Sequence, residues 1–134
     1  MAKKQKRWTY SPSKPKATES IKATVKAEAD ELVETVLKPQ NIKPPSEDMA
    51  FNYVVDIYTK WYRSYFYFCA KYANPRPNAI ASHFETKFAR LEYVEQDRYH
   101  LSYMRHTGKW WEVYQDLSLA ECLDTIRDDP LFMP

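Results

Sequence analysis

The chain of 134 residues carries 20 basic and 18 acidic residues, and 44% of its residues are hydrophobic and 16% aromatic. This length suffices for one domain with a single hydrophobic core and is too short for two. The single glycine, Gly108, excludes nucleotide sites of the Rossmann and P-loop types, because those loops need several glycines where the backbone approaches phosphate.

The first 16 residues differ in charge from the rest of the chain. They contain six of the basic residues and none of the acidic ones, so residues 17–134 hold four more acids than bases. Because this segment is polar and interrupted by Pro12 and Pro15, it cannot bury enough apolar surface to order itself. The sequence therefore predicts a disordered basic arm, residues 1–16, on a single mildly acidic domain, residues 17–134.

Short basic arms neutralise nucleic-acid phosphates, and an aromatic ring in such an arm can stack on a base. The candidate nucleic-acid-binding residues of the arm are Lys3, Lys4, Lys6, Arg7, Trp8, Lys14 and Lys16. A solubility tail is the alternative interpretation, but a tail of that kind does not require an aromatic residue such as Trp8.

A helix is predicted over residues 18–37. Its apolar side chains recur every three or four residues and so share one side of the helix; they are Ile21, Val25, Ala29, Leu32, Val33, Val36 and Leu37. Thr18 can cap the start of this helix, and Pro39 is expected to end it. Residues 40–48 are then a polar linker.

Five β-strands are predicted after this linker, at about 51–58, 62–72, 84–94, 98–106 and 110–115. Residues 51–58 alternate between two faces, as in a half-buried strand. The β-favouring run 51–72 is too long for one strand, so a hairpin turn is expected near 59–62. Gly108 suits the turn before the last strand.

Residue parity assigns the rings of the second strand to two faces. Phe66 and Phe68 share one face, which we expect to be the core, whereas Tyr65 and Tyr67 share the other. A sheet face that presents rings beside cations is suited to stack and hold single-stranded nucleic acid. The second set of candidate nucleic-acid-binding residues is therefore Arg63, Tyr65, Tyr67 and Lys71. Arg98, His100 and Met104 join this set if the faces of the strands coincide.

A C-terminal helix is predicted over residues 118–128, where Ser118 and Glu121 form a capping box. The order is then one helix, several strands with short connections, and a second helix. Short connections favour antiparallel neighbours. We therefore expect a two-layer α+β fold, in which an antiparallel meander of four or five strands carries the N-terminal and C-terminal helices on one face.

No catalytic, cofactor or metal site is expected. His100 and His106 lie about 20 Å apart if extended on one strand, too far to share a zinc ion. Cys69 and Cys122 lie in apolar contexts without a metal-binding or secretory pattern, which favours buried, reduced thiols in a cytoplasmic protein. No apolar run is long enough to span a membrane, and no catalytic motif is present.

Three motifs in residues 88–129 resemble a family of small bacterial domains of unknown function. FARLEYV at 88–94, MRHTGKW at 104–110 and SLAECLDTIRDD at 118–129 match the family patterns A-x-x-x-Y-V, M-R-x-x-x-K-W and S-L-x-E-x-L. The resemblance covers the C-terminal half of the chain, and the family's first hairpin usually has a glycine turn where this chain has KWYR. It implies an α+β fold and no catalytic residue, since the family has no assigned activity.

Two functions remain open on these observations. The first is a non-enzymatic RNA-binding or ribosome-associated protein, which binds the phosphates of RNA, including ribosomal RNA, with its basic arm. The alternative is a protein-interaction module whose aromatic sheet face contacts a protein partner or a second copy of the chain, without nucleic acid. Salt separates the two, because binding to phosphates weakens steeply as salt rises and an apolar interface does not.

Overall fold

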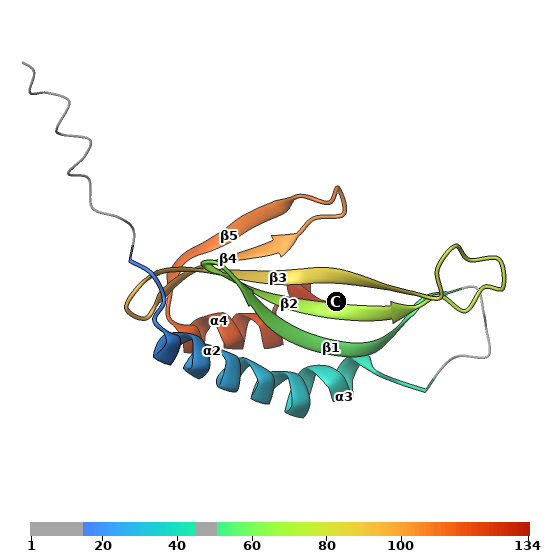
Figure 1. Cartoon of the computed structure of the whole chain (residues 1–134), viewed down its shortest axis with the longest axis horizontal. Helices are drawn as coiled ribbons and strands as arrows, with labels where there is room; N and C mark the ends of the chain where they lie inside the picture. Colours follow the sequence, from blue (N-terminus) through green and yellow to red (C-terminus); the bar gives the residue numbers. More distant parts are fainter. Residues whose placement is uncertain (1–14, 45–50) are drawn as a thin grey trace, which may run out of the picture.

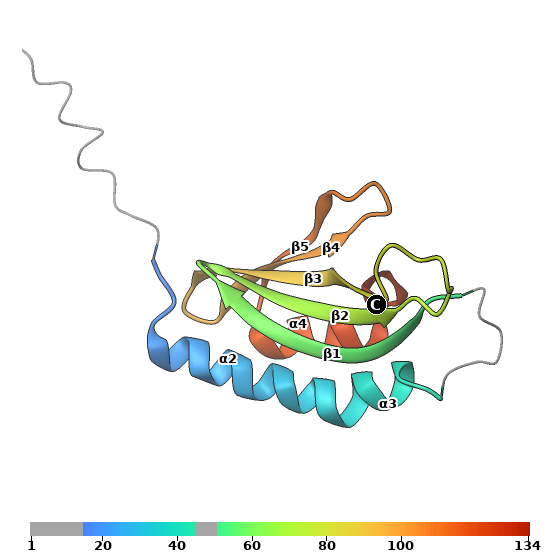
Figure 2. The ribbon, with the colours of Figure 1, turned by 45° about the vertical axis from the view of Figure 1, so that its right-hand side comes forward.

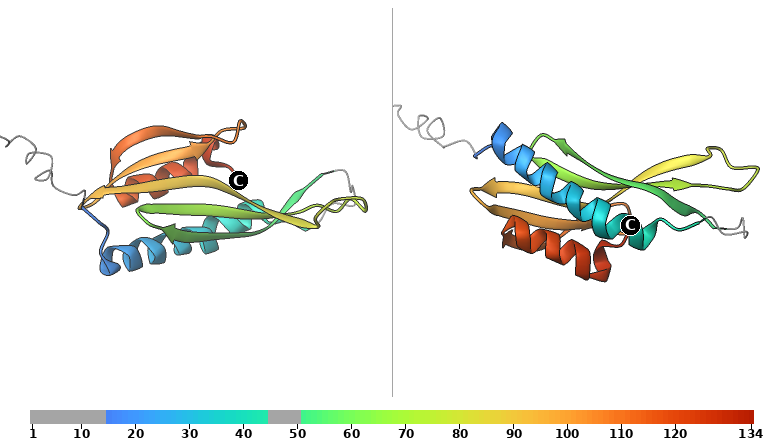
Figure 3. Two further views of the ribbon diagram at one scale, coloured as in Figure 1. Left: turned by 45° about the horizontal axis from the view of Figure 1, so that its top comes forward. Right: turned by 90° about the horizontal axis from the view of Figure 1, so that it is seen from below.

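The computed structural model describes residues 15–44 and 51–134. Five strands pair in consecutive order in one antiparallel sheet: β1 (Tyr53–Tyr62), β2 (Tyr65–Ala73), β3 (His83–Glu95), β4 (Arg98–Met104) and β5 (Trp110–Leu117). The helices α2 (Glu19–Leu32) and α4 (Leu119–Asp128) lie side by side over one face of this sheet (Figure 1; Figure 3, right). The predicted two-layer α+β meander with both helices on one face is confirmed.

Both main helices begin at the predicted capping residues. Thr18 Oγ1 accepts a hydrogen bond of 3.1 Å from the backbone N–H of Ile21. At the start of α4, Ser118 Oγ accepts from the N–H of Glu121 at 3.1 Å, and the carboxylate of Glu121 accepts from the N–H of Ser118 at 2.9 Å. Each cap satisfies backbone donors that the helix itself leaves without a partner.

The first helix does not end at Pro39, and this prediction is wrong. α2 continues into a π-helical turn, η2 (Val33–Leu37), and then into the short helix α3 (Lys38–Asn41). In the wide turn the N–H of Lys38 bonds to the carbonyl of Val33, five residues back. A proline inside an α-helix collides with the carbonyl four residues earlier, and the wider turn before Pro39 relieves this collision.

The first hairpin turn lies later than predicted. Tyr62 pairs with Tyr65, so the turn consists of Arg63 and Ser64 rather than residues near 59–62. Arg63 adopts a φ of 58°, which the sequence does not signal because two-residue hairpin turns usually place glycine or asparagine there. The other strand boundaries lie within two residues of the predicted ones, as at β3 and β5.

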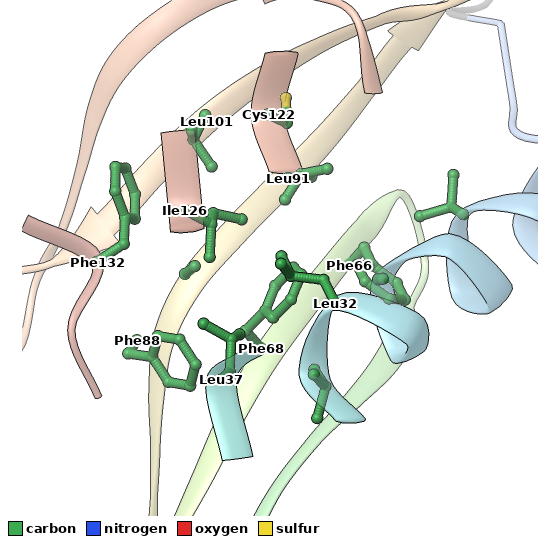
Figure 4. Close-up of a cluster of buried hydrophobic side chains, with 14 of the residues drawn as sticks. Leu32, Leu37, Phe66, Phe68, Phe88, Leu91, Leu101, Cys122, Ile126 and Phe132 are labelled. Atoms are coloured by element: carbon green, nitrogen blue, oxygen red, sulfur yellow. The ribbon is translucent and has the colours of Figure 1, made fainter. Parts of the chain in front are cut away.

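The core lies between the sheet and the two helices (Figure 4). Phe66 and Phe68 are both 0% exposed, as parity predicted. Their rings meet edge to face at 5.6 Å, and Phe68 also contacts Phe88 of β3 at 6.0 Å. The helices contribute Leu32, Leu37, Cys122 and Ile126. A 3-10 turn, η3 (Pro130–Phe132), adds the buried ring of Phe132.

Polar contacts fix α2 along β1. Thr59 Oγ1 donates to Asp30 at 2.5 Å and accepts from Lys26 Nζ at 2.8 Å. One helical turn earlier, Trp61 Nε1 donates to the backbone oxygen of Lys22 at 3.2 Å. These contacts satisfy polar atoms at the layer boundary, and they set the position of the start of α2 relative to the first hairpin.

The sheet is curled. Register shifts interrupt all four strand pairs, for example between Phe68 and Cys69 and between Tyr93 and Glu95. Such bulges bend strands and increase their twist. The β4–β5 hairpin consequently rises on the side of the sheet away from α2 and α4 (Figures 1 and 2). We call this uncovered side the open face.

Candidate functional site

A row of polar and aromatic side chains crosses the middle of the open face. Strand pairing places Lys60 opposite Tyr67, Tyr67 opposite Arg90, and Arg90 opposite Ser102. Residues directly opposite each other project to the same side of a sheet. These side chains therefore share the open face with Tyr65, which lies two residues from Tyr67 on β2.

Five side chains from β2, β3 and β5 form one connected group, the aromatic–cation cluster: Tyr65, Tyr67, Lys87, Arg90 and Trp110. The Arg90 guanidinium carbon lies 4.5 Å from the centroid of the Tyr65 ring and 4.9 Å from that of Trp110. Tyr67 lies 5.8 Å from Trp110 between ring centroids, and Lys87 Nζ lies 5.6 Å from the Tyr67 ring. All four distances allow attractive ring–ring or cation–π contacts.

Arg90 retains a hydrogen-bond donor without an acceptor. Its buried Nε is the one buried side-chain nitrogen or oxygen without a partner in residues 15–44 and 51–134. Such a donor costs about 1–3 kcal/mol if it stays unpaired. Within those same ranges, Lys60, Lys87 and Arg90 form no ion pair with a carboxylate. The cluster can therefore accept an anionic or carbonyl-bearing ligand.

Carboxylates border the cluster on the open face. Glu92 lies opposite Tyr65, Glu112 lies opposite Ser102, and Glu85 lies opposite Lys71. The positive charge is thus concentrated in the central row rather than spread over the whole face. A ligand with many phosphates would be attracted to that row and repelled at its ends.

The structure brings together two of the four candidates predicted on the second strand. Tyr65 and Tyr67 belong to the cluster, and their rings lie 6.2 Å apart. Lys71 shares the open face but lies four residues further along β2. Arg63 lies in the β1–β2 turn, so its predicted place on the strand face beside the tyrosines is wrong. The cause is the position of the turn, which the sequence places too early.

The faces of β2 and β4 coincide, a point that the sequence left open. Tyr65 pairs with Glu92, which in turn pairs with His100. Met104 pairs with Trp110 of the cluster. Arg98 instead forms an ion pair with Asp116 at 2.7 Å, which lowers the pKa of that carboxyl through the hydrogen bond from the guanidinium.

The candidates of the basic arm lie outside the described residues, apart from one. Lys16 is described and exposed. The remaining candidates, for which the structure gives no position, are Lys3, Lys4, Lys6, Arg7, Trp8 and Lys14. The predicted role of the arm therefore stays a prediction.

Sequence reasoning missed three members of the cluster, Lys87, Arg90 and Trp110. Parity along β3 gives a partial signal, because Arg90 lies between the buried residues Ala89 and Leu91 and must face away from the core. The bulge opposite Phe68 and Cys69 changes this parity for Lys87. Nothing local indicates that Trp110 of β5 reaches β2, since that contact depends on the curl of the sheet.

Comparison with known proteins identifies a family. The family described as "Domain of unknown function (DUF3024)" matches residues 4–134. The chain belongs to this family. The match covers the N-terminal helix and the first hairpin as well, so the resemblance is not restricted to the C-terminal half, as the sequence motifs alone suggested. No curated protein and no solved structure matches the chain.

In this DUF3024 chain the thiol of Cys69 is buried. Cys69 projects to the open face but is 1% exposed; burial raises the pKa of its thiol, and nearby Lys60 and Lys87 offset only part of this effect. The described part of the chain holds no group of three His, Cys, Asp or Glu side chains that could bind a metal ion. Nor does any helix there have the length and apolar character needed to cross a membrane.

Proposed function

We propose that this protein binds single-stranded nucleic acid, with RNA as the expected ligand, through the aromatic–cation cluster of the open face. Bases would stack on Tyr65, Tyr67 and Trp110, and Lys87 and Arg90 would contact phosphates or base oxygens. RNA is the expected form because its loops, bulges and ends, including those of ribosomal RNA, present unpaired bases. The basic arm would add phosphate contacts.

The observation that carries this proposal is the environment of Arg90. Its guanidinium lies between two rings, forms no ion pair with a described carboxylate, and keeps a buried Nε without an acceptor. A purely structural arginine in such a position would usually be satisfied by the protein itself. A ligand with phosphate or carbonyl oxygens would accept charge-assisted hydrogen bonds from this guanidinium, which no described carboxylate pairs with.

Charge favours nucleic acid over an apolar protein partner for this face. Stacking on tyrosine and tryptophan tolerates any base, and cations beside the rings hold the backbone. An interface with a second copy would bring the unpaired cations of two identical central rows near each other, and like charges at an interface oppose association. The protein-partner alternative is therefore the less favoured one.

The test is a binding titration of the full chain with labelled oligouridine and oligoadenosine, their DNA counterparts and a duplex, at several salt concentrations. We expect binding to the single strands that weakens as salt rises, and a loss of about tenfold or more for Tyr67→Ala. Lys87→Ala should weaken binding, whereas Lys43→Ala, which removes an equal charge from an exposed loop, should not. No binding to any single strand would overturn the proposal, and concentration-dependent dimerisation would then support the alternative.

A further inference from the structure

A pocket of about 550 Å³ lies where α2 begins and the β1–β2 hairpin turns. Figure 2 shows these two segments at the same end of the molecule. The described residues that line it are Lys16, Ala17, Glu19, Lys22, Arg63 and Ser64. Three of these are cations and one, Glu19, is an anion, so the described part of the lining carries an excess of two positive charges.

Two of the three described cations of this pocket, Lys22 and Arg63, lie over aromatic rings. Lys22 Nζ lies 5.6 Å from the centroid of the Trp61 ring, whose indole N–H bonds to the backbone of Lys22. The Arg63 guanidinium lies 5.2 Å from the Tyr62 ring. Neither these two cations nor Lys16 forms an ion pair within the described part of the chain. Their charges are therefore free to bind an anion.

The backbone of Arg63 is in an unfavourable conformation for a residue with a side chain. Its φ of 58° lies in the left-handed region, where glycine is favoured and other residues are strained. Strain of this kind is concentrated at functional sites, where the side chain has a task. Arg63 lines the pocket, and glycine would provide the same turn without a guanidinium.

We propose that this pocket binds a phosphate group. Arg63 would contact two phosphate oxygens through its planar fork, and Lys16 and Lys22 would add point charges. The positive end of the α2 dipole is directed to the same end of the molecule. The volume exceeds that of one phosphate, so the attached sugar and base can enter.

This inference deepens the proposed function and rests on it for the identity of the ligand, a phosphate of single-stranded RNA. Arg63 is two residues from Tyr65 of the cluster, and Lys16 directly follows the basic arm in sequence. A strand held by the arm and stacked on the open face would pass this end of the domain. The phosphate would belong either to the backbone or to a strand terminus.

The key variant is Arg63→Gly, because it removes the guanidinium and also relieves the strained turn. We expect affinity for oligouridine to fall about tenfold, and the slope of log affinity against log salt to become shallower by about 0.7. The melting temperature should stay the same or rise, which separates lost binding from lost folding. Arg63→Lys should bind with intermediate affinity, since it keeps the charge without the fork.

Gln96→Gly is the matched control for strain. Gln96 lies in the β3–β4 turn with a φ of 47° and does not line the pocket. This substitution should leave both affinity and the salt slope unchanged. Titrations with oligouridine that carries a 5′-phosphate, a 3′-phosphate or neither then show whether the bound phosphate belongs to a strand terminus or to the backbone. If one terminal phosphate raises the affinity and Arg63→Gly abolishes this gain, the pocket binds a strand terminus. If Arg63→Gly lowers the affinity equally for all three forms of oligouridine, the pocket binds a backbone phosphate.

A second measurement tests phosphate binding in the pocket independently of RNA binding. Inorganic phosphate, but not chloride at equal ionic strength, should shift the NMR signals of the Trp61 indole and the Arg63 side chain. If phosphate shifts them while no RNA binds, the pocket stands and the RNA function fails. If RNA binds and Tyr67→Ala weakens it while Arg63→Gly binds normally, the pocket assignment is overturned and the open face stands.

Discussion

The indole of Trp110 on β5 lies 5.8 Å from the ring of Tyr67 on β2, although β3 and β4 lie between these two strands. Neighbouring strands are about 4.8 Å apart, so upright side chains on a flat sheet would keep β2 and β5 about 14 Å apart. The contact reflects the curl that the bulges introduce. This curl brings Trp110 into contact with both Tyr67 and Arg90.

Replacing Trp110 should affect binding more than replacing its neighbour Trp111. Trp111 is 53% exposed and contacts Arg105 at 4.8 Å, on the opposite side of β5. Trp110→Ala should weaken oligouridine binding by about 1–3 kcal/mol through lost stacking, and should lower the free energy of unfolding by about 1 kcal/mol. Trp111→Ala should change affinity little. Titrations and urea denaturation check both, and equal losses of affinity would contradict the assignment of the open face.

The two faces of β2 should differ in their contribution to stability. Phe66→Ala removes a fully buried ring and should lower the free energy of unfolding by about 3–5 kcal/mol. Tyr67→Ala removes a half-buried ring on the open face and should cost about 1 kcal/mol. Chemical denaturation of the two variants measures the difference. Similar losses would mean that both faces of the sheet are core.

Local signals were sufficient for most of the fold. Parity placed Phe66 and Phe68 in the core because side chains of a strand alternate without exception until a bulge occurs. The capping box at Ser118 and Glu121 is likewise local, since both hydrogen bonds join residues three apart. These features depend on neighbouring residues alone and can therefore be predicted from the sequence.

The predictions that failed depend on backbone states that composition does not reveal. A proline ends most helices, but the π turn before Pro39 allows this helix to continue. The turn at Arg63 uses a left-handed residue where glycine is expected. Only two of the five cluster residues were predicted. The position of Trp110, for example, follows from the curl of five strands, which several bulges produce together and no single segment encodes.

The thiol of Cys122 should be inert and should make stability depend on pH. Burial raises its pKa from 9.0 to about 12, so its thiolate fraction at neutral pH falls on the order of 1000-fold and reaction with an aromatic disulfide reagent slows accordingly. The folded state keeps this proton above pH 9 while the unfolded state loses it. Stability should therefore fall from about pH 9 to about pH 12, by at most about 1.4 kcal/mol per pH unit from this group.

Urea denaturation at several pH values measures this dependence, and Cys122→Ala is the comparison. In this variant the free energy of unfolding should fall less steeply at alkaline pH, because the contribution of the thiol is gone. The contribution of other buried groups remains, such as that of Tyr99, whose pKa burial also raises. Rapid modification of Cys122 in the folded protein at neutral pH would contradict its burial.

Deleting residues 1–14 should separate the arm from the pocket, because it removes five cations and keeps Lys16. If each of Lys3, Lys4, Lys6, Arg7 and Lys14 neutralises one phosphate of a single strand, the slope of log affinity against log salt should become shallower by about 3 to 4. The melting temperature should not change, since this segment has no apolar periodicity that would tie it to the core. Titrations of the full and truncated chains with oligouridine measure the slope, and thermal unfolding provides the control.

The affinity should fall on this deletion, because residues 15–134, which remain, carry three more acids than bases and on average repel phosphate. Within the arm, Trp8→Ala should weaken binding by about 1–3 kcal/mol if the ring stacks on a base and should have almost no effect otherwise. An unchanged slope after truncation would mean that the arm contacts no phosphate. The cations around Arg90 and Arg63 would then supply the whole electrostatic part of binding, and Arg63→Gly in the truncated chain would make the remaining slope shallower by about 0.7.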